Sequence, residues 1–116
     1  MLKIAYGLFQ ELGLPFKMHG AVYLMDAIRY SIKDPTYMDS VHERLYPKVA
    51  ELYPVGPDAI EKAIRVAIEA MFARGNVDAI YGLFGEDISP EKAKLTNKPF
   101  IKACVKEVKR RMEIQE

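Results

Sequence analysis

The sequence predicts an all-α protein, a compact bundle of about six helices that contains a helix-turn-helix. Apolar residues recur at intervals of three and four along most of the chain, as they do on the buried face of a helix. Runs in which β-branched and polar residues alternate, the usual signal of a half-buried strand, are missing from the sequence. Half of the 116 residues are apolar, which is enough for one core, so we expect residues 1–116 to form a single domain.

Three helical segments are predicted ahead of residue 46, at about residues 1–12, 17–32 and 37–45. The first two carry apolar side chains on one face at helical spacing, which include Leu2 and Tyr6 in the first segment. Gly13 with Pro15 ends the first segment, and the Asp34-Pro35 pair ends the second, because neither pair continues a helix.

The stretch at about residues 46–75 is the predicted helix-turn-helix. Its first helix covers residues 46–53, with Pro47 in the first turn, where the missing N–H costs nothing. The Pro-Val-Gly-Pro sequence at 54–57 cannot lie inside one continuous helix and marks the turn. Pro57 or Asp58 then opens a long second helix that runs to Arg74 and stops at Gly75. Its buried face should hold Ile60, Ala63, Ile64, Ala67, Ile68 and Met71.

Two more helices are expected after the motif. Asn76 can cap a helix over residues 77–84, which Gly85 ends. A polar connection follows over residues 86–95, in which Ser89-Pro90-Glu91 suggests a short turn of helix. Thr96 or Asn97 caps the last helix. Its buried stripe is expected to consist of Phe100, Ile101, Cys104, Val105, Val108 and Met112.

Composition limits the classes of function. The single cysteine excludes an internal disulfide framework, which fits the reducing cytoplasm, where we expect the protein to act. No run of 18 apolar residues exists, so no membrane span is predicted. Net charge is only +1, but residues 1–90 hold 9 basic and 12 acidic side chains, whereas residues 91–116 hold 8 basic and 4 acidic ones. The small total therefore hides a basic end that could meet a nucleic acid.

Nothing in the sequence indicates an enzyme, a metal site or a cofactor site. His19 and His42 have no Cys, Asp or Glu partners at metal-ligand spacing, and we expect them on the surface or near helix ends. Cys104 falls on the apolar stripe of the last helix, where a buried, inert thiol is expected. Glycine-rich phosphate loops and serine-centred nucleophile motifs are also missing.

The outward face of the helix at 58–74 can be interpreted in two ways. The side chains near its start are Asp58, Glu61, Lys62 and Arg65, the predicted contacts to DNA bases. In a helix-turn-helix such residues reach base edges in the major groove, where Arg and Lys donate to guanine and Glu accepts from cytosine. Alternatively, Glu61, Arg65 and Glu69 are spaced four residues apart, as in the charge ladder of an ordinary solvated helix. Spacing alone leaves both interpretations open.

Basic residues around and after the motif are candidates for phosphate contacts. The predicted set is Lys48, Arg74, Lys92, Lys94 and Lys98. The last three precede or begin the final helix, where they could neutralise phosphates beside the groove. The more distal cluster at 109–111 is better interpreted as a solvated helix end, because basic side chains are favourable at a C-terminal turn.

A series of longer matches, in order and at constant spacing, points to one family. The stretches are Glu11-Leu12-Gly13-Leu14-Pro15, Gly20 with Tyr23-Leu24 and Asp26-Ala27-Ile28, Leu45-Tyr46-Pro47 with Ala50, Glu61 to Asn76, Asp78, Leu83-Phe84-Gly85, Lys92-Ala93-Lys94, Thr96-Asn97 and Phe100-Ile101. Through them the chain, from about Phe9 to Met112, resembles the C-terminal DNA-binding effector domain of the stage-zero sporulation response regulator of endospore-forming bacteria.

The resemblance implies a six-helix bundle that binds double-stranded DNA at a short G·C-containing box in promoters. It also implies contact with the sigma subunit of RNA polymerase and pairing of two domains, as a homodimer, on tandem boxes. In the family the last helix helps this pairing, which makes Phe100 to Met112 a candidate dimer surface.

The chain departs from the family pattern at three informative positions. The family begins its base-reading set with Glu-Arg-x-x-Arg, whereas this chain has Lys62 in place of the first arginine. Lysine keeps the charge but lacks the planar fork that reads guanine with two donors. Val66 stands where the family has histidine, and Phe72 where it has tryptophan. We therefore expect an altered target box or a reduced specificity.

Two functional hypotheses follow. The first is a sequence-specific DNA-binding transcription regulator with helix 58–74 in the major groove. Family members carry a receiver domain with a phosphoacceptor aspartate, and this sequence has none, so it represents either an excised domain or a stand-alone relative; the altered reading set favours the latter. The second hypothesis is a protein-interaction module that heterodimerises with, or titrates, a full-length regulator or sigma factor without reading DNA.

Overall fold

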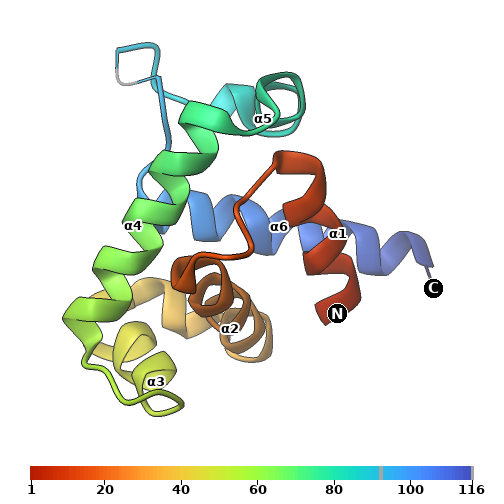
Figure 1. Ribbon diagram of the computed structural model, residues 1–116. Helices are drawn as coiled ribbons and strands as arrows, with labels where there is room; N and C mark the ends of the chain where they lie inside the picture. The colour runs from red at the N-terminus through yellow and green to blue at the C-terminus, as the bar shows by residue number, and fades with distance from the viewer. Residues whose placement is uncertain (92, 116) are drawn as a thin grey trace.

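Helices form nearly all the regular structure of the computed structural model, which describes residues 1–91 and 93–115 (Figure 1). The α-helices of this described part are α1 (Leu2–Leu12), α2 (His19–Lys33), α3 (Tyr46–Ala50), α4 (Pro57–Arg74), α5 (Val77–Phe84) and α6 (Asn97–Gln115). It contains no strand, and none of its helices is long and apolar enough to cross a membrane. The predicted all-α fold of about six helices is confirmed.

The packing of α2 against α4 forms the centre of the molecule. Figure 1 shows α4 along one side, with α3 at one end, α5 at the other, and α6 passing behind α1 and the loop that leads to α2. The two helices approach so closely that a Cβ atom on Gly20 would lie 2.0 Å from the carbonyl oxygen of Ala63. Only glycine fits there, so this contact fixes the start of α2 against the first half of α4.

The buried face of α4 agrees with its predicted pattern. Its fully or almost fully buried side chains are Ile60, Ile64, Ala67, Ile68 and Met71. Ala63, the sixth residue expected there, is half-buried at the edge of the α2 contact. Because the apolar side chains face the core, the charged residues of α4 must face outward.

The N-terminal helix departs from its predicted apolar face. Ala5, Phe9 and Leu12 are buried as expected, but Leu2 and Tyr6 are 49% and 46% exposed. The Tyr6 ring instead stacks on Phe16 from the following loop, with 4.5 Å between ring centroids. That loop also explains why α2 begins at His19 rather than residue 17, because Met18 N–H donates to the Pro15 carbonyl in a turn.

The α-helix predicted over residues 37–45 is wrong. A 3₁₀ turn (Pro35–Asp39) and a π-helical turn (Val41–Leu45) replace it, and the second leads directly into α3. Pro47 cannot donate the N–H that a regular helix would need at that point, so the preceding turn widens. In this wider turn Leu45 N–H donates to the carbonyl of Ser40, five residues earlier, at 3.2 Å, whereas an α-helix would use the residue four positions earlier.

Another predicted boundary also moves, and an additional turn follows α5. Helix α3 ends at Ala50 rather than residue 53, and the chain continues through tight turns, with Leu52 N–H donating to Val49 at 3.0 Å. In the connection after α5, a 3₁₀ turn lies at Gly85–Asp87, and the turn expected at residues 89–91 is also present, with Ala93 N–H donating to the Ser89 carbonyl at 2.8 Å. The turn between α3 and α4 is therefore longer than the four residues expected from its prolines and glycine.

The last helix buries its predicted stripe. Phe100, Ile101, Cys104, Val105 and Val108 are 0–8% exposed, and Met112 is half-buried. Burial raises the pKa of the Cys104 thiol, as expected for an inert structural cysteine. Because this stripe belongs to the chain's own core, it is not available as a dimer surface. Pairing through α6 would have to use its exposed, mainly basic side.

A second close approach joins α1 to the junction of α4 and α5. Gly13, in the left-handed conformation with a φ of 75°, ends α1 as predicted. Asn76 N–H donates to the Leu12 carbonyl at 3.0 Å, and the Asn76 side chain caps α5 by accepting from Ala79 N–H at 3.1 Å. A Cβ on Gly13 would lie 2.8 Å from the Gly75 Cα, so the two glycines meet backbone to backbone.

Candidate nucleic-acid interface

Helix α4 presents an exposed ridge of charged side chains. Its first turn begins with Pro57 after Gly56, whose carbonyl accepts from Ala59 N–H at 3.1 Å. Asp58 lies in this first turn, where a carboxylate is favourable beside the helix dipole. Asp58, Lys62 and Arg65 are exposed and Glu61 is partly exposed, so all four predicted base-contacting residues reach the surface.

The predicted charge ladder is also present on this ridge. Arg65 Nη1 lies 3.0 Å from a Glu61 carboxylate oxygen, and Arg65 Nε lies 3.9 Å from a Glu69 oxygen. The side chains of Arg65 and Glu69 are 50% and 52% exposed, and that of Glu61 is 28% exposed. Ion pairs this exposed are worth about 0–1 kcal/mol, so another partner can replace them.

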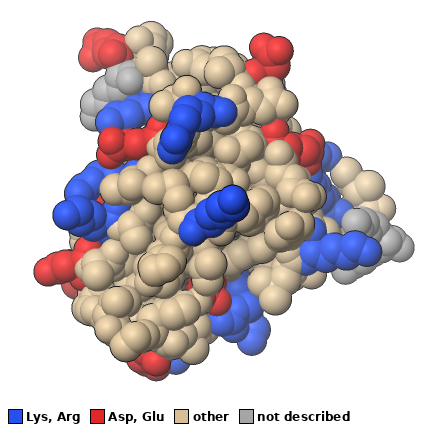
Figure 2. Space-filling model, in the orientation of Figure 1, with Lys and Arg blue, Asp and Glu red and all other residues tan. Residues whose placement is uncertain are grey.

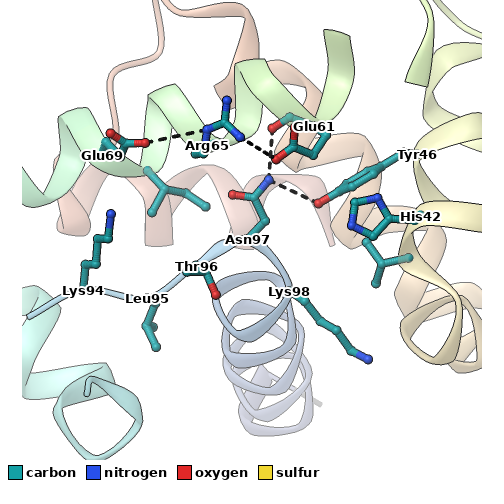
Figure 3. Close-up of a pocket in the computed structure, with 12 residues that line it drawn as sticks. His42, Tyr46, Glu61, Arg65, Glu69, Lys94, Leu95, Thr96, Asn97 and Lys98 are labelled. Atoms are coloured by element: carbon teal, nitrogen blue, oxygen red, sulfur yellow. Dashed lines mark hydrogen bonds and ion pairs between the residues drawn. The ribbon is translucent and has the colours of Figure 1, made fainter. Parts of the chain in front are cut away.

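A hollow of about 330 Å³ opens beside the ladder, between α4, the π-helical turn and the start of α6 (Figure 3). Its lining residues are Val41, His42, Tyr46, Glu61, Arg65, Ile68, Glu69, Lys94, Leu95, Thr96, Asn97 and Lys98. Cationic and anionic side chains therefore share this hollow, and elements distant in sequence form its walls.

Asn97 holds the walls of the hollow together. Its Nδ2 donates to the Glu61 backbone carbonyl at 3.0 Å and to the Tyr46 hydroxyl at 3.2 Å, as Figure 3 shows. Tyr46 is 2% exposed, and burial raises the pKa of its hydroxyl, so the group stays neutral and hydrogen-bonded near neutral pH. The start of α6 is thus tied to both α3 and α4.

Two of the predicted phosphate contacts lie beside the ridge. Lys94 and Lys98 are exposed and line the hollow with Glu61 and Arg65. Figure 3 shows the Lys94 side chain directed toward Glu69 and α4, whereas the Lys98 side chain points away from α4. The structure therefore brings these two lysines to the same flank of α4 as Arg65.

The other predicted phosphate contacts are not gathered there. Lys48, on α3, pairs with Glu51 at 3.5 Å and lies 5.7 Å from the centre of the Tyr30 ring. Arg74 is exposed in the last turn of α4, about 14 Å along the helix axis from Arg65. Lys92 lies outside the described residues.

Charge is dispersed rather than concentrated on the face of the molecule drawn in Figure 2. Figure 2 shows Lys and Arg side chains on this face separated by uncharged residues and by Asp and Glu side chains. Part of the basic C-terminal segment is also internally paired, because Arg110 and Arg111 both bind Glu107 at 2.7 Å. This pairing agrees with the interpretation of the distal cluster as a solvated helix end.

The described residues include no cluster of three or more His, Cys, Asp or Glu side chains placed to hold a metal ion. His19 and His42 are both exposed, at the start of α2 and in the π-helical turn. The His42 ring meets the Tyr46 ring edge-on, with 5.3 Å between centroids. Both histidines therefore lie on the surface as expected.

Sequence reasoning missed the roles of Asn97, Tyr46 and His42 in this site. Asn97 was expected only as a helix cap, yet it joins residues 36 and 51 positions away in the chain. No local spacing rule connects such positions. The one sequence signal was the Thr-Asn-Lys-Pro run, which marks a helix start but does not identify its tertiary partner.

One comparison with known proteins bears on this geometry. A family model described as "Sporulation initiation factor Spo0A C terminal" matches residues 5–108 of the 116-residue chain. The match spans every element that forms the ridge and its flanks, from α1 through most of α6.

Proposed function

Because the chain belongs to the Spo0A C-terminal family, the DNA-binding effector domains of sporulation initiation factors, we propose that it is a sequence-specific regulator of transcription. The observation that carries this proposal is the exposed ridge of α4. Its four candidate base-reading side chains are gathered in the first half of one helix, with Lys94 and Lys98 beside them. A DNA partner also agrees with the reducing cytoplasm expected from a lone cysteine.

In the proposed mechanism α3, the turn and α4 act as a helix-turn-helix over about residues 46–75. Helix α4 lies in the major groove, which is about 12 Å wide and admits one helix. Its N-terminal half faces the base edges, so Asp58, Glu61, Lys62 and Arg65 read the sequence.

Arg65 is the principal reader in this mechanism. Its guanidinium leaves Glu61 and Glu69 and donates instead to the O6 and N7 atoms of a guanine. Such a contact favours guanine over another base by about 1–3 kcal/mol. Glu61, once released, can accept from a cytosine amino group. Lys62 offers a point charge without a planar fork, so it contributes less to base choice than arginine would.

Lys94 and Lys98 supply the sequence-independent part of the binding. They flank α4 at the start of α6, and Asn97 between them is bonded to α4 itself. Phosphate contacts from this rigid position would set the depth and register of α4 in the groove. Arg74 and Lys48 remain candidate contacts to phosphates farther along the duplex.

We further propose two protein partners. A second copy on an adjacent box would compensate for the small interface of one domain, because affinity grows when two sites are engaged together. The sigma subunit of RNA polymerase is the proposed partner in activation, on the strength of the family resemblance.

A protein-interaction module without DNA reading is the second candidate function. The observations that favour it are the two carboxylates that occupy Arg65, the exposed Val66 in place of a polar reader, and the dispersed charge. Such a module would bind a full-length regulator or sigma factor through the same ridge.

A salt-dependent mobility shift separates the two functions. DNA selected by the protein from a random pool, or the family's box, is compared with a random duplex of equal length. We expect binding to both at low salt and selective binding at higher salt, because only phosphate contacts weaken steeply with salt. If neither duplex binds at low salt, the DNA hypothesis is wrong and the interaction module remains.

A further inference from the structure

A second hollow, of about 490 Å³, lies on the other flank of α4. One wall is formed by Lys17, in the turn before α2, and by His19, the first residue of α2, and α4 forms the other wall with Lys62 and Val66. Unlike the hollow beside Asn97, this one has no acidic residue in its lining. Neither Lys17 nor Lys62 makes an ion pair within the described part of the chain, so both charges are available to a ligand.

The position of Lys17 and His19 relative to α4 is fixed by packing. Gly20 follows His19 directly and lies three residues after Lys17, and its backbone lies against the Ala63 carbonyl with no room for a side chain. The His19 ring also rests near Tyr23, with 6.2 Å between centroids. Lys17 and His19 are therefore held beside the ridge by the central α2–α4 contact.

The two flanks fit the two edges of one groove. An α-helix is about 10–12 Å across with its side chains, and the major groove is about 12 Å wide. A helix that fills the groove consequently brings its flanks toward the phosphates of both strands. Lys94 and Lys98 lie at one flank, and Lys17 and His19 at the other.

We propose that Lys17 and His19 bind the phosphate backbone of the strand opposite to the one contacted by Lys94 and Lys98. This inference rests on the proposed docking of α4 in the major groove. It assigns a DNA contact to the turn before α2 and to the first residue of that helix, outside the helix-turn-helix, and makes the groove contact two-sided. The hollow's lack of carboxylates removes the repulsion that a phosphate would meet beside Glu61 and Glu69.

The first test is the salt dependence of DNA binding by Lys17→Ala. Each phosphate contact contributes about 0.9 to the slope of log affinity against log salt. We expect Lys17→Ala to make that slope less steep by about 0.9 on both selected and random duplexes. The ratio of wild-type to variant affinity should therefore fall about 3-fold between about 50 and 200 mM salt. The matched control is Lys33→Ala, an exposed lysine at the opposite end of α2, whose slope should equal that of the wild type.

The second test assigns the strand. Single phosphates are neutralised as methylphosphonates, one position and one strand at a time, and each duplex is titrated with wild type, Lys17→Ala and Lys94→Ala. The defect of Lys17→Ala should disappear on duplexes neutralised in one strand, and that of Lys94→Ala on duplexes neutralised in the other. The double variant Lys17→Ala/His19→Ala should lose more affinity than Lys17→Ala alone.

Each other outcome overturns the proposal. An unchanged slope for Lys17→Ala with normal wild-type binding excludes the α2 contact but leaves the proposed function intact. If the affinity defects of Lys17→Ala and Lys94→Ala both disappear on duplexes neutralised in the same strand, the two-sided arrangement is excluded. If the wild type binds no duplex, both the inference and the proposed function are wrong.

Discussion

Arg65 is one residue with two competing sets of partners. In the free protein Glu61 and Glu69 share its guanidinium, at 3.0 and 3.9 Å. Exposed pairs of this kind contribute about 0–1 kcal/mol, whereas a bidentate guanine contact is worth about 1–3 kcal/mol. Because the guanine contact is the stronger of the two, Arg65 should exchange partners when DNA is present. Under the proposed docking, the solvated ladder and the base-reading face are thus compatible, because they correspond to the free and the DNA-bound state of the same side chains.

Replacement of Arg65 tests the bound state. Arg65→Ala should weaken binding to the selected box by about 1–3 kcal/mol and relax base choice at one position, because the two-donor contact is lost. Titrations against the selected box and its single-base variants measure both effects. Arg74→Ala serves as the control, since it removes the same charge from the far end of α4. Equal losses on selected and random DNA would contradict base reading.

Glu69 should limit unspecific binding. Its carboxylate holds Arg65 in the free protein and repels phosphates that approach the ridge. Glu69→Gln should therefore raise affinity for random DNA more than affinity for the selected box, which lowers the ratio between them.

The control for this prediction is Glu113→Gln, an exposed carboxamide substitution near the end of α6. It makes the same change in net charge far from the ridge, so any general effect of charge appears in both variants. Identical affinities of Glu69→Gln and Glu113→Gln for random duplex would rule out a local role of Glu69.

Among the elements, the α2–α4 pair determines where the ridge can lie. Gly20→Ala would place its Cβ 2.0 Å from the Ala63 carbonyl oxygen, so the helices must separate. Overpacking of this kind costs about 1–3 kcal/mol, and we expect that loss in the free energy of unfolding measured with urea. DNA affinity should fall as well, since α4 moves relative to both flanks.

Gly7→Ala is the matched control for Gly20→Ala. Gly7 lies inside α1 with no atom within 4 Å of an added Cβ. Here alanine should stabilise the protein by about 0.5–1 kcal/mol, because glycine is unfavourable inside a helix. A loss of stability in both variants would mean that the α2–α4 contact is not the cause.

The elements differ in how far their sequence determines them. Helices α1, α2, α4 and α6 follow from apolar spacing and from glycine and proline punctuation, which are local signals. The π-helical turn does not, because it depends on a register change forced by Pro47 and on tertiary packing of Val41 and Leu45. The four candidate base readers were identifiable from one helical face. The hollow beside them was not, because Asn97 joins it across 36 and 51 residues of chain.

At the scale of the whole molecule, an ion-pair network closes α6 onto α1. The hydrogen bond from Arg110, followed by that from Arg111, lowers the pKa of Glu107 to about 2. Arg111 also binds Glu11 on α1. The Glu107 side chain is 12% exposed, so solvent screens this network less than it screens the ladder on α4.

This network should make stability depend on pH under acidic conditions. The folded pKa of Glu107 lies below its ordinary value of 4.5, so its contribution is complete above that pH and is lost as pH falls toward about 2. Glu107→Gln should be less stable than the wild type at neutral pH, and the difference should shrink to near zero around pH 2. Urea unfolding over a pH series measures this convergence, with Glu113→Gln as the charge control. A difference that stays constant with pH would contradict the assignment.

The tight backbone contacts described above have a consequence for how this family can evolve. Side chains at positions 13, 20 and 75 would collide with backbone, so descendants that keep the helix arrangement must keep glycine there. Positions 7 and 82 have open space and are free to vary. No such steric constraint acts on the exposed positions 62 and 66. In the proposed docking of α4, side chains at these two positions can therefore change without moving the scaffold, so relatives with the same helix arrangement are free to differ in the DNA that they bind.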